Sequence, residues 1–445
     1  MDKKKLIIIF SAVGVIVIGA IIAFVFLRKP ATPPSITLEF WGVFDDKVVF
    51  QPVIDDFQKQ YPYITVNYHK KDVTTYEQEL IDALAAGRGP DIFSINNTWL
   101  PKDGDKLSPA PIDLVNPKKI SDTFVDVVSQ DFVWKGYVYA LPQSVDSLAL
   151  FYNKDLFNSA GLAEPPATWS EFNSDVEKLT RRDDRQNILQ SGAALGTAQN
   201  INRSTDILAA LMLQSGVQMV SADFRTATFD QTSRAANGQS FSPGERALTF
   251  YTNFASPLTA AKNLNQVYTW NQYQHYSIDA FVEGKVAMIF NYSYQIPALR
   301  ARAPHLNFAI APLPQINANQ NVLTLANYWG QAVSKTSLNV SAAWQFLAFI
   351  SSQDSVKKYA TAGKKPVARR DLIDWQKDDP DLGVFAQQAL VAKSWWEVDN
   401  SAVETIFAKM IDAVSINRVA PADALRNASQ QITVLMQKYW QDRQQ

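Results

Sequence analysis

The stretch that decides the fold lies at residues 136–157 and reads GYVYALPQSVDSLALFYNKDLF. Two apolar runs, at 138–141 and 148–152, flank a polar break that contains Asp146. Both runs are rich in aliphatic and aromatic residues and too short for a buried helix, so both are predicted to be strands. A carboxylate between two buried strands needs hydrogen-bonding partners. Asp146 is therefore either a polar group at a ligand cleft or a capping residue in a turn.

Strand and helix patterns alternate along the sequence that precedes this stretch. Residues 36–41 and 64–68 alternate apolar with polar side chains, as half-buried strands do. Between them apolar residues recur with helical spacing, at Val49, Phe50, Val53, Ile54 and Phe57. This strand–helix–strand order predicts a parallel sheet. Open α/β sheets bind ligands at the carboxyl ends of their strands, so the loop after residues 36–41 is a candidate binding segment.

Composition limits the classes of protein that need to be considered. The chain has 445 residues, 47% hydrophobic and 19% charged, which is typical of a globular protein with two or three domains. Its net charge of -1 does not indicate nucleic-acid binding. The absence of cysteine excludes disulfides, thiolate metal sites and a lipid-modified N-terminal cysteine.

The N-terminus carries a long apolar run. Residues 6–27 contain no charge, and a helix of 22 residues spans roughly 30 Å of hydrocarbon. The alternative is a cleaved signal peptide, but its apolar region is shorter and a small-residue cleavage site follows it. We therefore expect residues 1–29 to be a single-pass transmembrane anchor and residues 30–35 to be a Pro-rich linker. The body would then lie on the extracytoplasmic side of the cell membrane.

Several sequence blocks occur together in an order typical of one family. These are the opening stretch, LIDALAAGRGPDIFSINNTWL at 80–100, a capping box formed by Thr168 and Glu171, and IDAFVEGKVAMIFNYSYQIPALR at 278–300. Together they resemble the extracellular solute-binding proteins of ABC importers, in the maltose-binding-like branch that contains the sugar binders. The resemblance covers nearly all of residues 36–440. Two departures are the predicted anchor in place of a lipidated cysteine, and Tyr294 where the sugar binders often carry Trp.

The resemblance implies an α/β, two-lobed, periplasmic-binding-protein-like fold of type II. Lobe 1 would comprise residues 36–144 and 332–370, and lobe 2 residues 145–331 and 371–445. The polar break would be the first chain crossing, and residues 327–331 the second. A small solute, with carbohydrate as the leading class, would bind between the lobes, which close by hinge motion. The closed form would deliver it to the transmembrane permease subunits of an ABC importer.

Candidate binding residues follow from what a sugar presents, which is flat apolar faces rimmed by hydroxyl groups. Asp146 falls where the sugar-binding relatives carry an acid, and its alternative is a hinge residue bonded to backbone. Tyr294 falls where they carry a stacking Trp, and its alternative is a core aromatic. By analogy, residues 202–206 supply polar contacts. The other candidates follow strands, precede a helix or lie at the second crossing: Phe44, Asp45, Asn97, Thr98, Trp99, Trp270, Tyr328 and Trp329.

For several of these candidates the alternative is a turn or hinge packing rather than ligand contact. No catalytic, metal or cofactor site is predicted, since the three histidines lie far apart and neither a phosphate-binding loop nor a nucleophile elbow is present. Paired carboxylates serve glycoside hydrolases, so a membrane-anchored glycoside hydrolase is the alternative from another class. A non-transporting sensor or adhesin with the same fold is the third possibility.

Overall fold

The computed structural model describes residues 34–235, 237–256, 267–318 and 321–443. The predicted transmembrane anchor at residues 1–29 lies outside these ranges, as does most of the predicted linker. Within the described ranges, no helix combines the length and the apolar character that crossing a membrane requires.

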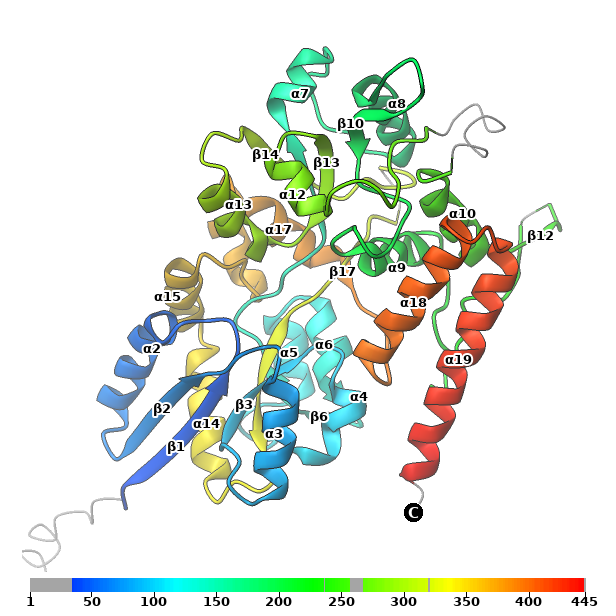
Figure 1. Cartoon of the computed structure of the whole chain (residues 1–445). Coiled ribbons are helices and arrows are strands. Elements are labelled where there is room, and N and C mark those ends of the chain that lie inside the picture. Colours follow the sequence, from blue (N-terminus) through cyan, green and yellow to red (C-terminus); the bar gives the residue numbers. More distant parts are fainter. Residues whose placement is uncertain (1–33, 236, 257–266, 319–320, 444–445) are drawn as a thin grey trace, which may run out of the picture.

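One mixed sheet organises the lower lobe of Figure 1. Its strand order is β2-β1-β3-β16-β4, with β7 also paired to β16. The predicted parallel pairing is confirmed, because β1 runs parallel to both β2 and β3, whereas β16 is antiparallel to β3. The bounds are β1 (Ile36–Gly42), β2 (Ile64–Lys70), β3 (Ile92–Asn96), β4 (Leu107–Ser108), β7 (Ala140–Leu141) and β16 (Trp329–Ser334).

A second mixed sheet, in the order β14-β8-β13-β10-β9, organises the upper lobe (Figure 1). The apolar run at 148–152 forms β8, which is antiparallel to β13 and β14 on either side. The polar break that contains Asp146 therefore carries the chain from β7 in one sheet to β8 in the other. The bounds are β8 (Ala149–Asn153), β9 (Arg181–Arg182), β10 (Ile188–Ala193), β13 (Val286–Asn291) and β14 (Phe308–Ala311).

Helices cover both sheets. Around the first lie α2 (Lys47–Gln60), α3 (Tyr76–Ala85), α4 (Leu100–Asp103), α5 (Pro117–Thr123), α6 (Asp126–Phe132), α14 (Val340–Ile350), α15 (Gln353–Gly363) and α16 (Ile373–Gln376). Around the second lie α7 (Lys154–Ser159), α8 (Trp169–Leu179), α9 (Ser204–Gln214), α10 (Pro243–Asn253), α12 (Ser277–Val282), α13 (Ile296–Arg302), α18 (Asn400–Ser415) and α19 (Pro421–Asp442). Helix α17 (Gly383–Gln388) lies between the lobes, with Phe385 in the core of the second and Ala386 in the core of the first. The short pieces are β5 (Val133–Trp134) with β6 (Tyr137–Val138), β11 (Ser233–Arg234) with β12 (Ser240–Phe241), and the 3-10 turns η1 (Gly104–Lys106), η2 (Ser293–Gln295), η3 (Arg370–Leu372) and η4 (Ala389–Val391).

Local sequence signals account for several of these boundaries. The predicted capping box is confirmed, because Thr168 accepts from the Glu171 backbone N–H while the Glu171 carboxylate accepts from the Thr168 N–H. Residues 121–128 do not form one helix, because α5 ends and α6 begins within that range. Phe124 interrupts the helix with extended backbone (φ -104°, ψ 163°) and forms a bridge with Arg369.

Two separate buried clusters form the cores of the two lobes. The chain passes between them three times, and the residues on either side of each passage are Val145 and Leu148, Leu325 and Ala326, and Ala392 and Trp395. The second and third passages are tied together by β15 (Thr324–Leu325), which pairs in parallel with β17 (Ala392–Lys393). The third passage lies well after residue 370, where the sequence placed the last lobe boundary. The boundaries themselves stay a prediction.

Candidate ligand-binding site

A cavity of about 360 Å³ lies between the two lobes and is lined by residues of both. The first lobe contributes the ends of β1 and β3, the second contributes α9 and α18 with the loop after β13, and the crossings lie between them. Eight of the ten residues predicted from sequence line this cavity, namely Phe44, Asp45, Asn97, Thr98, Asp146, Tyr294, Tyr328 and Trp329. Their contact with a ligand stays a prediction.

The other two predicted residues, Trp99 and Trp270, lie outside the cavity wall. Trp99 packs behind it, edge to face with Trp329 at a centroid distance of 5.0 Å. Trp270 is fully buried in the core of the second lobe, where its Nε1 donates to Asn200. Its backbone N–H bonds to the carbonyl of Phe254, at the end of α10, and this fixes it inside the lobe.

Asp146 joins the first crossing to the loop after β13. Its Oδ1 accepts from the backbone N–H groups of Ser147 (2.9 Å) and Ser293 (3.1 Å), while Oδ2 accepts from Ser293 Oγ (2.7 Å) and the Tyr294 N–H (3.3 Å). Four donors use the acceptor capacity of a carboxylate. Burial raises the pKa of Asp146, although these bonds act in the opposite direction. Of the two predicted interpretations, the geometry favours a hinge residue that positions the Tyr294 loop.

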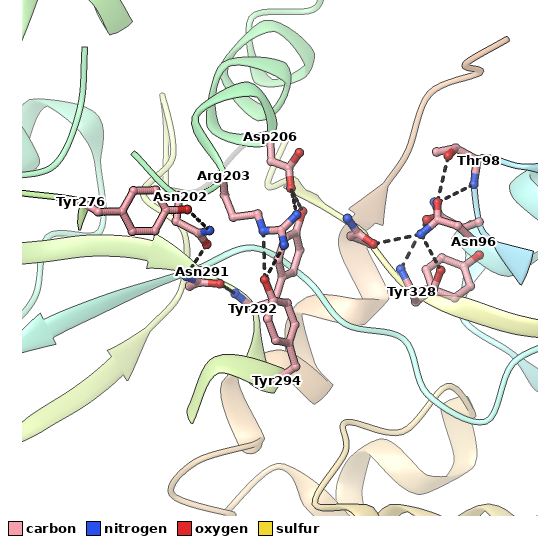
Figure 2. Close-up of polar contacts among 12 residues, drawn as sticks. Asn96, Thr98, Asn202, Arg203, Asp206, Tyr276, Asn291, Tyr292, Tyr294 and Tyr328 are labelled. Atoms are coloured by element: carbon pink, nitrogen blue, oxygen red, sulfur yellow. Dashed lines mark hydrogen bonds and ion pairs between the residues drawn. The ribbon is translucent and has the colours of Figure 1, made fainter. Parts of the chain in front are cut away.

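Tyr294 presents its ring to the cavity while its hydroxyl is held from behind. Arg203 Nε and Nη2 both donate to Tyr294 Oη, at 3.0 and 2.6 Å (Figure 2). The ring is stacked on Tyr292 with 21° between the planes, and the side chain is 44% exposed. Because it is this exposed, Tyr294 is not a core aromatic. It offers a fixed ring face rather than a free hydroxyl.

Arg203 is held in place by its backbone and by an acid. It has a left-handed φ of 64° directly before α9, a conformation that costs energy for a side chain other than glycine. Its Nη1 lies 3.9 Å from Asp206 Oδ2, which accepts from Tyr292 Oη at 2.9 Å. Figure 2 shows the guanidinium between this acid and the Tyr294 hydroxyl. Burial raises the pKa of Asp206, and Arg203 opposes that rise.

The first-lobe wall is aromatic, and its charges are already paired. The Phe44 ring is 49% exposed and meets the Trp329 ring edge to face at 5.4 Å. Asp45 accepts from Tyr359 Oη at 2.6 Å and pairs with Lys365 at 3.0 Å. The exposed surface of this wall is therefore mainly ring surface.

The residues after β3 were predicted either to contact ligand or to form a turn and pack at the hinge. Asn96 Oδ1 accepts from the backbone N–H and the hydroxyl of Thr98, at 3.1 and 2.9 Å (Figure 2). Asn97 instead bonds the second crossing, since its N–H donates to the Tyr328 carbonyl at 3.0 Å. Asn96 is thus the turn-forming residue, and Asn97 fastens this edge of the sheet to the crossing.

Two cavity-lining acids, Glu397 and Glu404, were not predicted from the sequence. Burial, and after it the charge of Asp206, raises the pKa of both. They reach the cavity only because the third crossing returns the chain to the second lobe, and no local motif marks them. Arg203 and Asp206 fall within the segment 202–206, for which polar contacts were expected by analogy.

Comparison with known proteins gives consistent similarities. The family model described as bacterial extracellular solute-binding protein matches residues 42–357. A putative binding protein of Brucella abortus is 24% identical, and the match covers 84% of this chain and 89% of the relative. A maltotriose-binding protein of Pyrococcus abyssi is also 24% identical, and the match covers 76% of this chain and 68% of the relative.

Among solved structures, the sugar-binding protein from Xanthomonas citri is 19% identical with a TM-score of 0.75, covering 92% of this chain and 99% of its own. A cyclo/maltodextrin-binding protein complexed with maltotetraose is 19% identical with a TM-score of 0.73, covering 92% and 98%. At these identities the solved structures show the two-lobed α/β fold alone. The matched family and these relatives are binding proteins.

Proposed function

We propose, since this chain belongs to the bacterial extracellular solute-binding proteins, that it is the substrate-binding protein of an ABC importer for a mono- or oligosaccharide. The resemblance inferred from its sequence blocks is thereby confirmed at the level of the family. The sugar would be captured in the inter-lobe cavity and delivered to the transmembrane permease subunits. The body would face the extracytoplasmic side, held at the cell membrane by the N-terminal anchor.

The observation that carries this proposal is the fixed, exposed Tyr294 ring in a cavity that also holds charged hydrogen-bonding groups. An aromatic face suits the apolar face of a pyranose, and the neighbouring acids and Arg203 suit its hydroxyl groups. The maltotriose-binding relative supports the carbohydrate class. Three passages of the chain between the lobes suit a hinge that closes on the ligand.

A thermal-shift screen of the full chain in detergent tests the proposal. The panel is maltotriose, maltotetraose, mannobiose, polyols, short peptides and polyamines. A ligand at a hundred times its Kd stabilises the folded state by about 2.7 kcal/mol, which raises Tm by several degrees. We expect carbohydrates alone to do so. A Tm raised by peptides or polyamines and unmoved by every sugar would contradict the carbohydrate assignment.

The same full chain, incubated with each sugar that raises Tm, tests binding against hydrolysis. We expect the sugar to be recovered unchanged, as judged by chromatography. Release of shorter products would overturn the receptor proposal in favour of a membrane-anchored glycoside hydrolase.

A further inference from the structure

One carboxylate behind the cavity bonds three of the residues that line it. Asp131, on α6, accepts at Oδ2 from Tyr328 Oη (2.8 Å) and from Asn97 Nδ2 (3.1 Å), and at Oδ1 from Ser394 Oγ. The three donors come from three separate segments. Asn97 follows β3, Tyr328 lies at the second crossing, and Ser394 lies at the third. All three line the cavity, whereas Asp131 does not.

Neighbouring residues of α6 fasten the same segments. Gln130 Nε2 donates to the Ser394 carbonyl at 2.7 Å. The Tyr328 hydroxyl also lies 3.2 Å from the Val127 carbonyl, and its ring meets the Phe132 ring edge to face at 5.5 Å. Helix α6 therefore bonds to both the second and the third crossing, and Asp131 is the charged residue among these contacts.

We propose that Asp131 is a positioning residue that ties the end of β3 to two of the three crossings and so fixes how the cavity wall is arranged. A carboxylate suits this position because it only accepts hydrogen bonds, and all three facing groups offer a hydrogen. An asparagine there would turn an amide N–H₂ toward another donor. The inference rests on the proposed function in one respect, that the solute binds against this wall.

The ionisation of Asp131 makes the arrangement sensitive to pH. Burial raises its pKa to about 7, against the hydrogen bonds from Ser394, Tyr328 and Asn97. The titratable groups that face it are Tyr328, from the second crossing, and Glu397, from the segment before α18. Once protonated, the carboxyl group must itself donate, so one of the three hydrogen bonds that it accepts is lost. Binding that requires the ionised form would therefore strengthen as pH rises through 7.

Amide hydrogen exchange of the ligand-free full chain tests the proposal without any sugar. Asp131→Asn should speed exchange about tenfold at residues 326–329 and 393–395, with β8 unchanged as evidence of an intact fold. The matched control is Asp126→Asn, on the same helix, because Asp126 is exposed and pairs with Arg370 instead. Equal exchange in the two variants would overturn the proposal. Ser394→Ala, which removes one donor and keeps the acid, should give a smaller increase at the same segments, and no increase there would count against it.

Affinity for maltotriose, measured by calorimetry between pH 6 and pH 8, supplies a readout that a merely structural residue would not move. The ionised fraction of a group with a pKa of about 7 rises about tenfold over this range, so the wild-type affinity should rise by the same factor. The affinity of Asp131→Asn should not change over this pH range, and the affinity of Asp126→Asn should change as that of the wild type does. An identical pH profile in Asp131→Asn would contradict the proposal. If neither maltotriose nor any other sugar of the screen bound to the three proteins, the proposed ligand class would fail, while the exchange result would still decide on Asp131.

Discussion

The two walls of the inter-lobe cavity differ in the chemistry that they offer. The first-lobe wall exposes the rings of Phe44 and Trp329, while its Asp45 is committed to Lys365 and Tyr359. The second-lobe wall exposes the Tyr294 ring among Arg203, Asp206, Glu397 and Glu404. The residues that line the second wall thus include most of the acidic and basic side chains of the cavity.

Under the proposed function, this division predicts that closure of the two lobes strengthens binding. The first lobe alone offers ring faces together with the polar Asn97 and Thr98. The second lobe alone holds Arg203 and Asp206 as a partly buried pair at one side of the cavity. Only when the lobes close are both kinds of contact made in a site from which water is largely excluded. We therefore expect changes in the second wall to cost more than changes in the first.

The largest effect should come from Arg203→Ala. This change removes both hydrogen bonds to Tyr294 Oη and leaves Asp206 without its cation. Arg203 also faces the cavity, and loss of its charge-assisted hydrogen bonds to the ligand should cost about 2–3 kcal/mol, so carbohydrate affinity should fall roughly a hundredfold in calorimetry. The control is Arg225→Ala, because Arg225 is exposed and stacks on Trp440 far from the cavity. Equal affinities in the two variants would contradict the assigned importance of the second wall.

Tyr294→Ala should rank next. Loss of a desolvated stacking ring costs about 2 kcal/mol of binding free energy. Tyr294→Phe keeps the ring face and loses only the hydroxyl that accepts from Arg203, so it should cost about 1 kcal/mol. Tyr273→Ala, at a tyrosine that is 84% exposed and outside this cavity, is the control for both. If Phe and Ala were equally harmful at 294, the ring face would not be what binds.

Phe44→Ala tests the first wall and should cost less, about 1 kcal/mol of binding free energy. The change removes an edge-to-face contact with Trp329 and one exposed apolar surface, and no charge loses its partner. Val48→Ala, at a nearby exposed position, should leave affinity unchanged. A loss for Phe44→Ala larger than that for Arg203→Ala would reverse the proposed ranking of the two walls.

The smallest effect concerns stability and its dependence on pH. The pKa of Glu397 is raised in the folded chain, first by burial and then by Asp206. Folded Glu397 therefore holds its proton at pH values where the unfolded chain has released it, and it lowers stability as pH rises above the usual glutamate range. Glu397→Gln should therefore flatten the fall of Tm as pH rises above the usual glutamate range. A steeper fall of Tm with rising pH in the variant would show that Glu397 is stabilised by a cation rather than destabilised by burial and by Asp206.

Local signals were enough to predict much of the fold. Alternation at β1 and β2, helical spacing in α2 and the capping box at Thr168 all act within a few residues, and the structure has each of them. The aromatic wall was predictable for the same reason, because Phe44 directly follows a strand. The crossing at Asp146 was predictable only through the family resemblance, because the residues alone indicated no more than a carboxylate that needs partners nearby.

The second wall depends on contacts that no short pattern records. The left-handed φ of Arg203 sets the direction in which its side chain points. Glu397 and Glu404 reach the cavity because the third crossing, far along the chain, returns the backbone to the second lobe. Trp270 was predicted to contact ligand because it precedes a helix. Its side chain is instead buried in the core of the second lobe, where its backbone N–H bonds to the Phe254 carbonyl. Asp131 has no motif at all, and its three partners meet only in the folded chain.

The most direct test of the central claim is a calorimetric titration of the Phe44→Ala/Arg203→Ala double variant beside the wild type. The ligand is the carbohydrate that gives the largest rise in Tm in the screen. We predict one binding site in the wild-type chain and no detectable binding in the double variant, with both proteins melting cooperatively. Equal affinity in the two proteins would contradict the claim that a sugar is held between an aromatic wall and a charged one.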